Sequence, residues 1–141
     1  PSYDGKYLMF NLMDYGYFSI WHKESDLWLM DLETGKSFSL DGANSNDADS
    51  YHNWSIDSHW FVFTSRRENG LYSQLYLSCI DDEGKATKPF LLPQKDPKKY
   101  YATTLYSFNT PDFTSRPVEL DSRAASAAIS SDKRIPTSIK E

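Results

Sequence analysis

The chain of 141 residues is long enough to bury the core of one domain, and its net charge of -5 comes without a basic cluster, which argues against nucleic acid or an anionic membrane surface as a partner. Cys79 is its one cysteine, so no internal disulfide can form, and no apolar run approaches the roughly 18 residues that a membrane-spanning helix needs. The aromatic share of 16%, with ten Tyr and four Trp, favours β-structure, because flat rings suit a half-buried pleated surface.

The first predicted element follows a Ser-x-Asp turn in "SYDGKYLMFN", residues 2–11. Residues 7–10 (Tyr-Leu-Met-Phe) read as a short strand that is apolar on both faces, as a strand buried in a stack would be. Residues 17–21, "YFSIW", form the next apolar segment. "DLWLMDLETGKSFSL", residues 26–40, then predicts strand, tight turn and strand, with the turn at residues 33–36.

The same order returns about 50 residues later, which is the length of a propeller blade. "SIDSHWFVFT", residues 55–64, places Ser-x-Asp before the strand at 60–63. "GLYS", residues 70–73, is a weaker match to the second segment. Residues 74–92, "QLYLSCIDDEGKATKPFLL", again predict strand, turn and strand, with the turn at 81–85. Each copy therefore predicts an antiparallel meander of three or four strands.

Ser-x-Asp-Gly-Lys before an aromatic strand, followed by "DLWLMDLETG", resembles the WD40-like (PD40) repeat of TolB-like β-propellers, and also the propeller domains of prolyl-oligopeptidase relatives. "DSYHNWS" and "FVFTSRR", followed by "KPFLLPQKDP", resemble the C-terminal blades of TolB-like proteins of the Bacteroidetes type. The resemblance covers residues 2 to about 118. In that repeat the usual turn is Ser-Pro-Asp-Gly. In this chain Tyr3 and Ile56 replace the Pro of the two copies, and Ser58 replaces the Gly of the second copy.

Four residues are predicted to be structural turn residues: Ser2, Asp4, Ser55 and Asp57. An Asp there caps backbone N–H groups ahead of a strand, and a Ser does so more weakly. His52 lies close enough in sequence to suggest a Ser/His/Asp hydrolase set with Ser55 and Asp57. A nucleophilic Ser normally sits on a strained elbow such as Gly-x-Ser-x-Gly, and the chain has none, so we expect no catalytic residues and no enzyme.

Two further polar segments raise alternatives. Residues 41–50, "DGANSNDADS", are rich in oxygen ligands that suit Ca²⁺, but they do not fit the EF-hand pattern, so we interpret them as an inter-blade loop and expect no metal and no cofactor. Arg66 and Arg67 follow the strand at 60–63. They are either a solvated turn or, with Tyr51 and His52, a polar rim at the mouth of a propeller where a partner docks.

The C-terminal part changes period. Asp96 and Pro97 predict the start of a helix whose apolar face would carry Tyr101, Leu105 and Phe108, ending at residues 109–111. From about residue 120 the chain is rich in Ala, Ser and charge, which predicts a mobile tail with a brief helix at 122–129.

The predicted organisation is therefore all-β: a partial propeller of about two blades with a short C-terminal helix and a flexible tail. It divides into a first blade with the inter-blade loop (1–53), a second blade (54–95), a helix and edge segment (96–119) and the tail (120–141). The chain starts at Pro1 without Met or a signal-like segment, so we expect it to be cut from something longer or processed.

The resemblance implies a non-enzymatic scaffold that binds protein partners in the periplasm or envelope of a bacterium. Two blades leave apolar faces open, which predicts self-association. One alternative is a carbohydrate- or peptidoglycan-binding module, in which Tyr15, Tyr17, Trp21 or Trp28 would stack on sugar rings. Another is the accessory propeller of an oligopeptidase-like enzyme whose active groups lie elsewhere.

Overall fold

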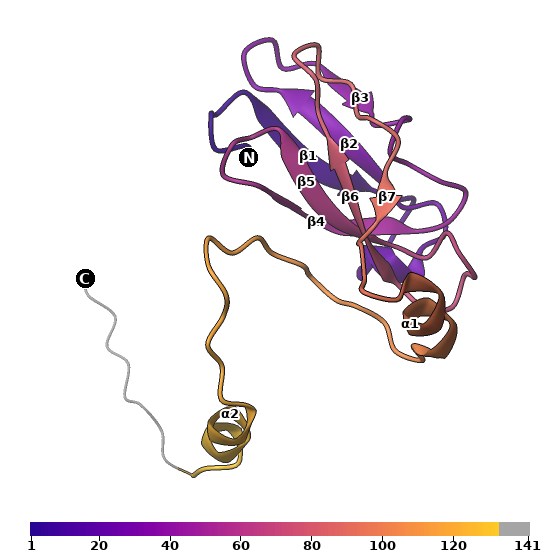
Figure 1. Cartoon of the computed structure of the whole chain (residues 1–141). Helices are drawn as coiled ribbons and strands as arrows, with labels where there is room; N and C mark the ends of the chain where they lie inside the picture. Colours follow the sequence, from indigo (N-terminus) through magenta and orange to yellow (C-terminus); the bar gives the residue numbers. More distant parts are fainter. Residues whose placement is uncertain (133–141) are drawn as a thin grey trace.

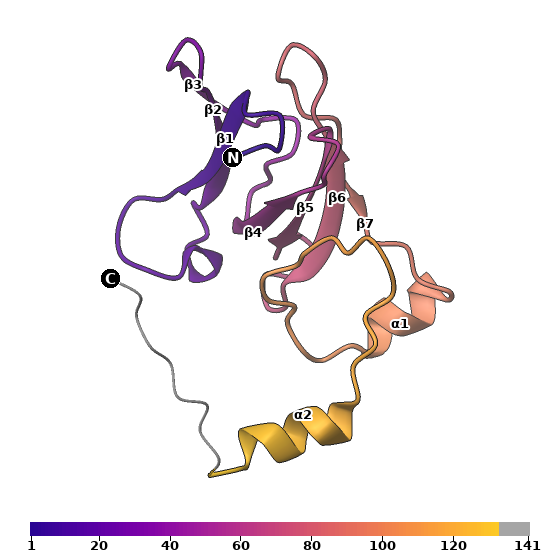
Figure 2. The ribbon, with the colours of Figure 1, turned by 90° about the vertical axis from the view of Figure 1, so that its left-hand side faces the viewer.

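The computed structural model describes residues 1–132 and consists mainly of two antiparallel β-sheets. The three-stranded sheet has the order β1-β2-β3 and the four-stranded sheet the order β4-β5-β6-β7, and neither closes on itself. The strands are β1 (Tyr7–Leu12), β2 (Asp26–Asp31), β3 (Ser37–Ser39), β4 (Asp49–Trp54), β5 (Trp60–Ser65), β6 (Gln74–Cys79) and β7 (Phe90–Leu91). Figure 2 shows the two sheets side by side, each a simple meander, so the prediction of a β-class protein is confirmed.

The first sheet forms because the side chains of β1 and β2 alternate between two faces. Met9 pairs with Leu29, and both side chains are buried together with Leu27. Phe10 pairs with Trp28 on the opposite face, where both are only partly buried. The turn that joins β2 to β3 lies at residues 32–36, as predicted, with Gly35 at φ +68°.

The second sheet begins five residues before its predicted boundary at residue 54. β4 pairs with β5 in a register that shifts between Ser50 and Asn53, and β5 pairs with all six residues of β6. β4 was not predicted as a strand, and its first two residues, Asp49 and Ser50, are the last two of the segment interpreted as the inter-blade loop. The β6–β7 turn lies where it was predicted, with Gly84 at φ +80°.

A corner built on Ser2 and Asp4 precedes β1. The Ser2 hydroxyl donates to Oδ1 of Asp4 (2.6 Å) and accepts from the N–H of Tyr7 (3.0 Å). The same Asp4 oxygen accepts from the N–H of Lys6 (3.1 Å), and Gly5 makes the turn at φ +75°. The hydrogen bonds from Ser2 and from the Lys6 N–H hold the pKa of the Asp4 carboxyl below its ordinary value.

The corner before β5 repeats this arrangement at Ser55 and Asp57. The Ser55 hydroxyl donates to Asp57 and accepts from the N–H of Trp60 (3.1 Å), and Asp57 accepts from the N–H of His59 (3.0 Å). Ser58 occupies the position of Gly5 with φ +61°. The bonds from Ser55 and His59 lower the pKa of the Asp57 carboxyl in the same way. The two corners therefore have the same hydrogen-bond pattern.

The sheets stack face to face, and their facing side chains form one core. Its buried members are Met9, Leu27, Leu29, Leu40, Ala43, Trp54, Phe61, Phe63, Tyr76 and Ile80. Because the corners match, Leu8 and Phe10 of β1 are equivalent to Phe61 and Phe63 of β5. The first sheet covers the face of the second sheet that carries Phe61 and Phe63. The equivalent face of the first sheet carries Leu8, Phe10, Trp28 and Met30, and none of the described strands or helices packs on it. We call these four residues the open face.

The two segments that were matched between the strands of the repeat, residues 17–21 and 70–73, are not strands. Within residues 17–21 the chain turns at Phe18, whose φ is +57°, and continues as the 3₁₀ helix η1 (Ser19–Trp21). Residues 70–73 follow a turn in which Oδ1 of Asn69 accepts from the N–H groups of Leu71 and Tyr72 (2.9 and 3.0 Å). Both segments are loops at the same end of the sheets because β1 and β5 both run toward that end from their corners.

The helix α1 (Pro97–Thr103) starts as predicted, with Asp96 as N-cap and Pro97 at its first position. It ends well before residue 109, and Leu105 is exposed, so the predicted long apolar face is wrong. The helix α2 (Ser122–Ile129) has the predicted bounds and lies apart from the sheets (Figure 1). The predicted mobility of residues 133–141 concerns residues outside the described part of the chain.

Candidate functional site

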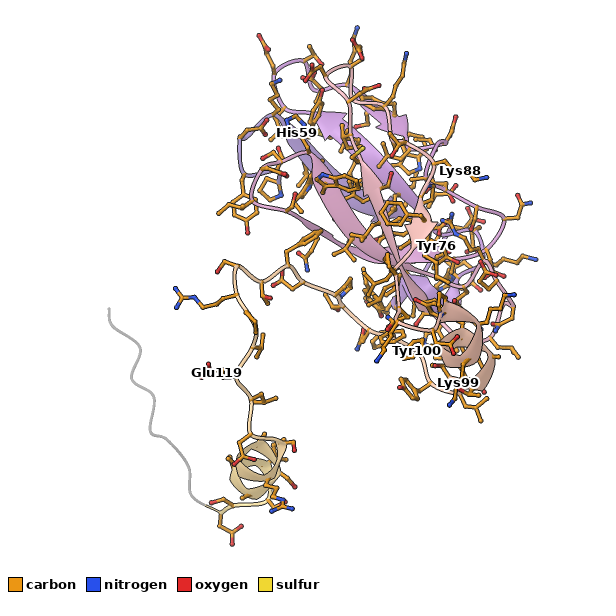
Figure 3. All side chains as sticks on the ribbon, viewed as in Figure 1. His59, Tyr76, Lys88, Lys99, Tyr100 and Glu119 are labelled. Atoms are coloured by element: carbon orange, nitrogen blue, oxygen red, sulfur yellow. The ribbon has the colours of Figure 1, made fainter. Side chains whose placement is uncertain are left out.

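The loops at the far end of the sheets from the corners surround a pocket of about 290 Å³. Four segments that are distant in sequence meet there: the η1 loop, β4 through Tyr51, residues 66–73 after β5, and residues 107–109 after α1. Its lining residues are Phe18, Ile20, Trp21, Tyr51, Arg66, Leu71, Ser73, Ser107, Phe108 and Asn109. Labelled residues in Figure 3 mark the two ends of the sheets, with His59 near the corners and Tyr100 on α1 near the opposite end.

Arg66 holds two of these loops together. Its guanidinium donates to the carbonyl of Ile20 (3.3 Å) and to that of Gly70, and its Cζ lies 5.1 Å from the centre of the Trp21 ring. A cation over an aromatic face is attracted by the ring quadrupole. The buried Nε of Arg66 has no hydrogen-bond partner in the described structure.

Arg67 points into the protein instead. Its Nη2 lies 2.7 Å from Oδ1 of Asp49, whose side chain is completely buried, and it also donates to the carbonyl of Ala43 (2.7 Å). The guanidinium stacks 4.5 Å from the centre of the Tyr76 ring. Burial raises the pKa of Tyr76, whose hydroxyl donates to Glu68 (2.7 Å). Arg67 therefore neutralises a buried carboxylate and does not line the pocket.

His52 and Tyr51 are neighbours on β4 with different surroundings. The Nε2 of His52 donates to the carbonyl of Met9 on β1 (2.9 Å), which joins the two sheets, and its buried Nδ1 has no hydrogen-bond partner among residues 1–132. Burial lowers the pKa of His52, although the bond to Met9 opposes the shift. Tyr51 has φ +50° and lines the pocket. Of the four predicted rim residues, the structure thus brings Tyr51 and Arg66 to one site, and His52 and Arg67 lie within the sheet packing.

The considered Ser/His/Asp set is not assembled. The Ser55 hydroxyl is bonded to Asp57 and to backbone groups of Trp60, whereas the imidazole of His52 is bonded to β1. The His52 imidazole therefore does not contact the Ser55 hydroxyl, as the base of such a set would have to.

The loop of residues 41–48 is organised by side-chain bonds to the backbone. Asn44 pairs with β2 as a further strand would, accepting from the N–H of Leu27 (2.9 Å) and donating to its carbonyl (3.0 Å). Asp49, at the end of this loop, accepts from the N–H and hydroxyl of Ser45 (2.6 and 2.8 Å) in addition to Arg67. Within residues 1–132, no group of three or more His, Cys, Asp or Glu side chains is placed to hold a metal ion.

Three of the four aromatic residues considered for sugar stacking are exposed on the loop that contains η1. Tyr15, Tyr17 and Trp21 have exposed fractions of 72%, 85% and 71%, whereas Trp28 is partly buried on the open face. Phe18, Leu71 and Asn109 were not predicted as site residues, because only the folded chain brings their loops together. The only sequence signal near Phe18 was Gly16, which marks a turn just before the apolar segment of residues 17–21.

None of the helices in the described part of the chain is long and apolar enough to cross a membrane. No protein family, curated protein or solved structure matches the chain.

Proposed function

We propose that the two sheets are consecutive blades of a TolB-like β-propeller. The repeated corners support this, because they define which strands and faces of the two sheets are equivalent. The face of the first sheet that packs on the second is not the equivalent of the face that it meets, so each sheet uses one face toward the sheet before it and the other toward the sheet after it. The open face would take a further meander in a complete ring. In the isolated chain it would be a surface for self-association.

Within that architecture, the proposed function is a non-enzymatic scaffold that binds a protein partner in the bacterial envelope or periplasm. The observation that carries it is the loop end, where Phe18, Trp21 and Leu71 have exposed fractions of 72%, 71% and 66% around one pocket. Aromatic and Arg side chains are the usual anchors of protein interfaces. The compartment comes from the family resemblance alone.

Site-specific cross-linking in envelope extract tests this function. A photo-reactive residue at Leu71 samples the loop end, and the same residue at Ile56, also exposed but on the corner before β5, is the matched control. The proposal expects a single protein, identified by mass spectrometry, to cross-link from Leu71 and not from Ile56. Cross-linking to no protein from Leu71, or equally from both positions, would contradict it.

The second candidate is carbohydrate or peptidoglycan binding, which the exposed rings of Tyr15, Tyr17 and Trp21 favour. Retention of the chain on insoluble peptidoglycan, lost on substituting these three residues by Ala, would favour it. Under the third candidate, an accessory propeller of an oligopeptidase-like enzyme, the catalytic groups would lie outside this chain.

A further inference from the structure

The pocket at the loop end combines four aromatic rings with one charge. Phe18, Trp21, Tyr51 and Phe108 line it, and among the residues that the structure describes Arg66 is the one charged residue in its wall. No carboxylate of residues 1–132 lines it, so the local charge is positive although the whole chain is acidic. A cationic ligand is disfavoured because Arg66 already lies over Trp21.

The backbone at the pocket is held in a costly conformation. Three described residues other than Gly have positive φ, and two of them, Phe18 and Tyr51, line this pocket. For a bulky residue this region of backbone space costs about 1–3 kcal/mol, and such residues cluster where ligands are bound. The third, Ser58, is explained by its corner.

Arg66 has donor capacity left. Its bonds to Ile20 and Gly70 use one N–H on each Nη atom and leave a second N–H on each, and among the described residues no further partner of these groups is found. Because Arg66 lines the pocket, these N–H groups are available to an acceptor there. A carboxylate is the acceptor that fits both the geometry and the charge of guanidinium.

From these observations we propose that the pocket binds an extended acidic segment of a protein partner. One aromatic or aliphatic side chain of the segment enters between Phe18, Trp21 and Tyr51, and a neighbouring carboxylate pairs with Arg66. The exposed amide of Asn109 at the wall is available to the backbone of the segment. This assignment rests on the proposed scaffold function and specifies the chemistry of its partner.

Nuclear magnetic resonance of the whole chain tests the assignment with defined probes. The probes are acetyl-Glu-Phe-Glu-amide, acetyl-Lys-Phe-Lys-amide and a trimer of N-acetylglucosamine. The acidic peptide should shift the Trp21 indole N–H and the Asn109 side-chain amide in a saturable way. The basic peptide should bind about tenfold more weakly, because it replaces an ion pair by a like-charge contact.

Two variants locate the binding. Trp21→Ala should abolish the shifts at Asn109, and Tyr17→Ala should leave them unchanged, since Tyr17 is as exposed but does not line the pocket. Arg66→Gln should remove the preference for the acidic peptide, and the dispersion of its spectrum shows whether the fold is retained.

Binding of the sugar trimer alone, equal binding of both peptides, or no shift at the pocket would each overturn the assignment. Its failure is distinguishable from that of the scaffold function. If the protein cross-linked from Leu71 is still captured by Trp21→Ala, the pocket assignment fails and the scaffold function stands. If the acidic peptide binds at the pocket but no protein cross-links from Leu71, the scaffold function fails and the preference of the pocket for acidic peptides stands.

Discussion

The hydroxyl of Ser58 accepts a hydrogen bond of 2.9 Å from the backbone N–H of Asp4, 54 residues away in the chain. This bond joins the corner of the first sheet directly to that of the second. Ser58 makes this bond from a left-handed backbone, at φ +61°, and Gly5 stands at the equivalent position of the other corner. The Ser at the position of Gly5 therefore makes a contact between the two corners that a Gly could not make.

Two substitutions of Ser58 separate the contribution of its hydrogen bond to Asp4 from the cost of its positive φ. Ser58→Ala loses the hydrogen bond, worth about 1 kcal/mol, and keeps the strained backbone, whereas Ser58→Gly loses the bond and relieves the strain. We expect urea unfolding to show Ser58→Gly about 1 kcal/mol more stable than Ser58→Ala. Equal stabilities, or the opposite order, would show that the positive φ carries no cost.

The buried pair of Arg67 and Asp49 should contribute strongly to stability when only one partner is removed. Arg67→Met keeps an unbranched apolar stem beside Tyr76 but leaves the fully buried Asp49 carboxylate without its cation. The expected loss in free energy of unfolding is about 3–5 kcal/mol. The double variant Asp49→Asn/Arg67→Met should recover part of this loss. A single variant as stable as the wild type would refute the structural role of Arg67.

The loop before β4 passes very close to the β6–β7 turn at Gly42. A Cβ at Gly42 would lie 2.2 Å from the carbonyl oxygen of Ala86, so one backbone must move in Gly42→Ala. We expect this variant to lose about 1–3 kcal/mol, as overpacked sites do. Gly5→Ala is the control, because a Cβ there meets no atom within 4 Å and only the positive φ adds cost, about 1 kcal/mol.

His52 should make stability depend on pH. Burial lowers its pKa in the folded chain below the ordinary value of about 6.5, so below that pH the unfolded chain binds more protons than the folded one. Stability should therefore fall as the pH drops from about 6.5 toward the folded pKa. His52→Gln, which can still donate to Met9, should flatten the urea-midpoint profile over this window. Parallel profiles for the two proteins would rule out His52 as the cause.

The features that the sequence predicted are those encoded by neighbouring residues. The two Ser-x-Asp corners, the turns at Gly35 and Gly84 and the N-cap at Asp96 all depend on hydrogen bonds or dihedral angles within a few positions. Such local chemistry is visible in the printed sequence.

The features that were missed depend on distant contacts. β4 has a polar sequence without the alternation typical of a strand, so it was not predicted as one. Its polar side chains are accommodated by distant contacts, since Asp49 pairs with Arg67 and His52 donates to Met9 of β1. The same holds for the candidate site. Arg66 and Tyr51 were identified as rim residues, but the pocket exists only where the loops of Phe18 and Asn109 meet them.

The most direct test of the account concerns the open face of the first sheet. Sedimentation velocity over a range of concentrations should show self-association of the wild-type chain, because none of the described strands or helices covers the apolar face of Phe10 and Trp28. Trp28→Lys should be monomeric, and Trp21→Lys, the same change on the exposed loop, should associate like the wild type. A wild-type chain that stays a compact, cooperatively melting monomer at every concentration would contradict the stacked-repeat account.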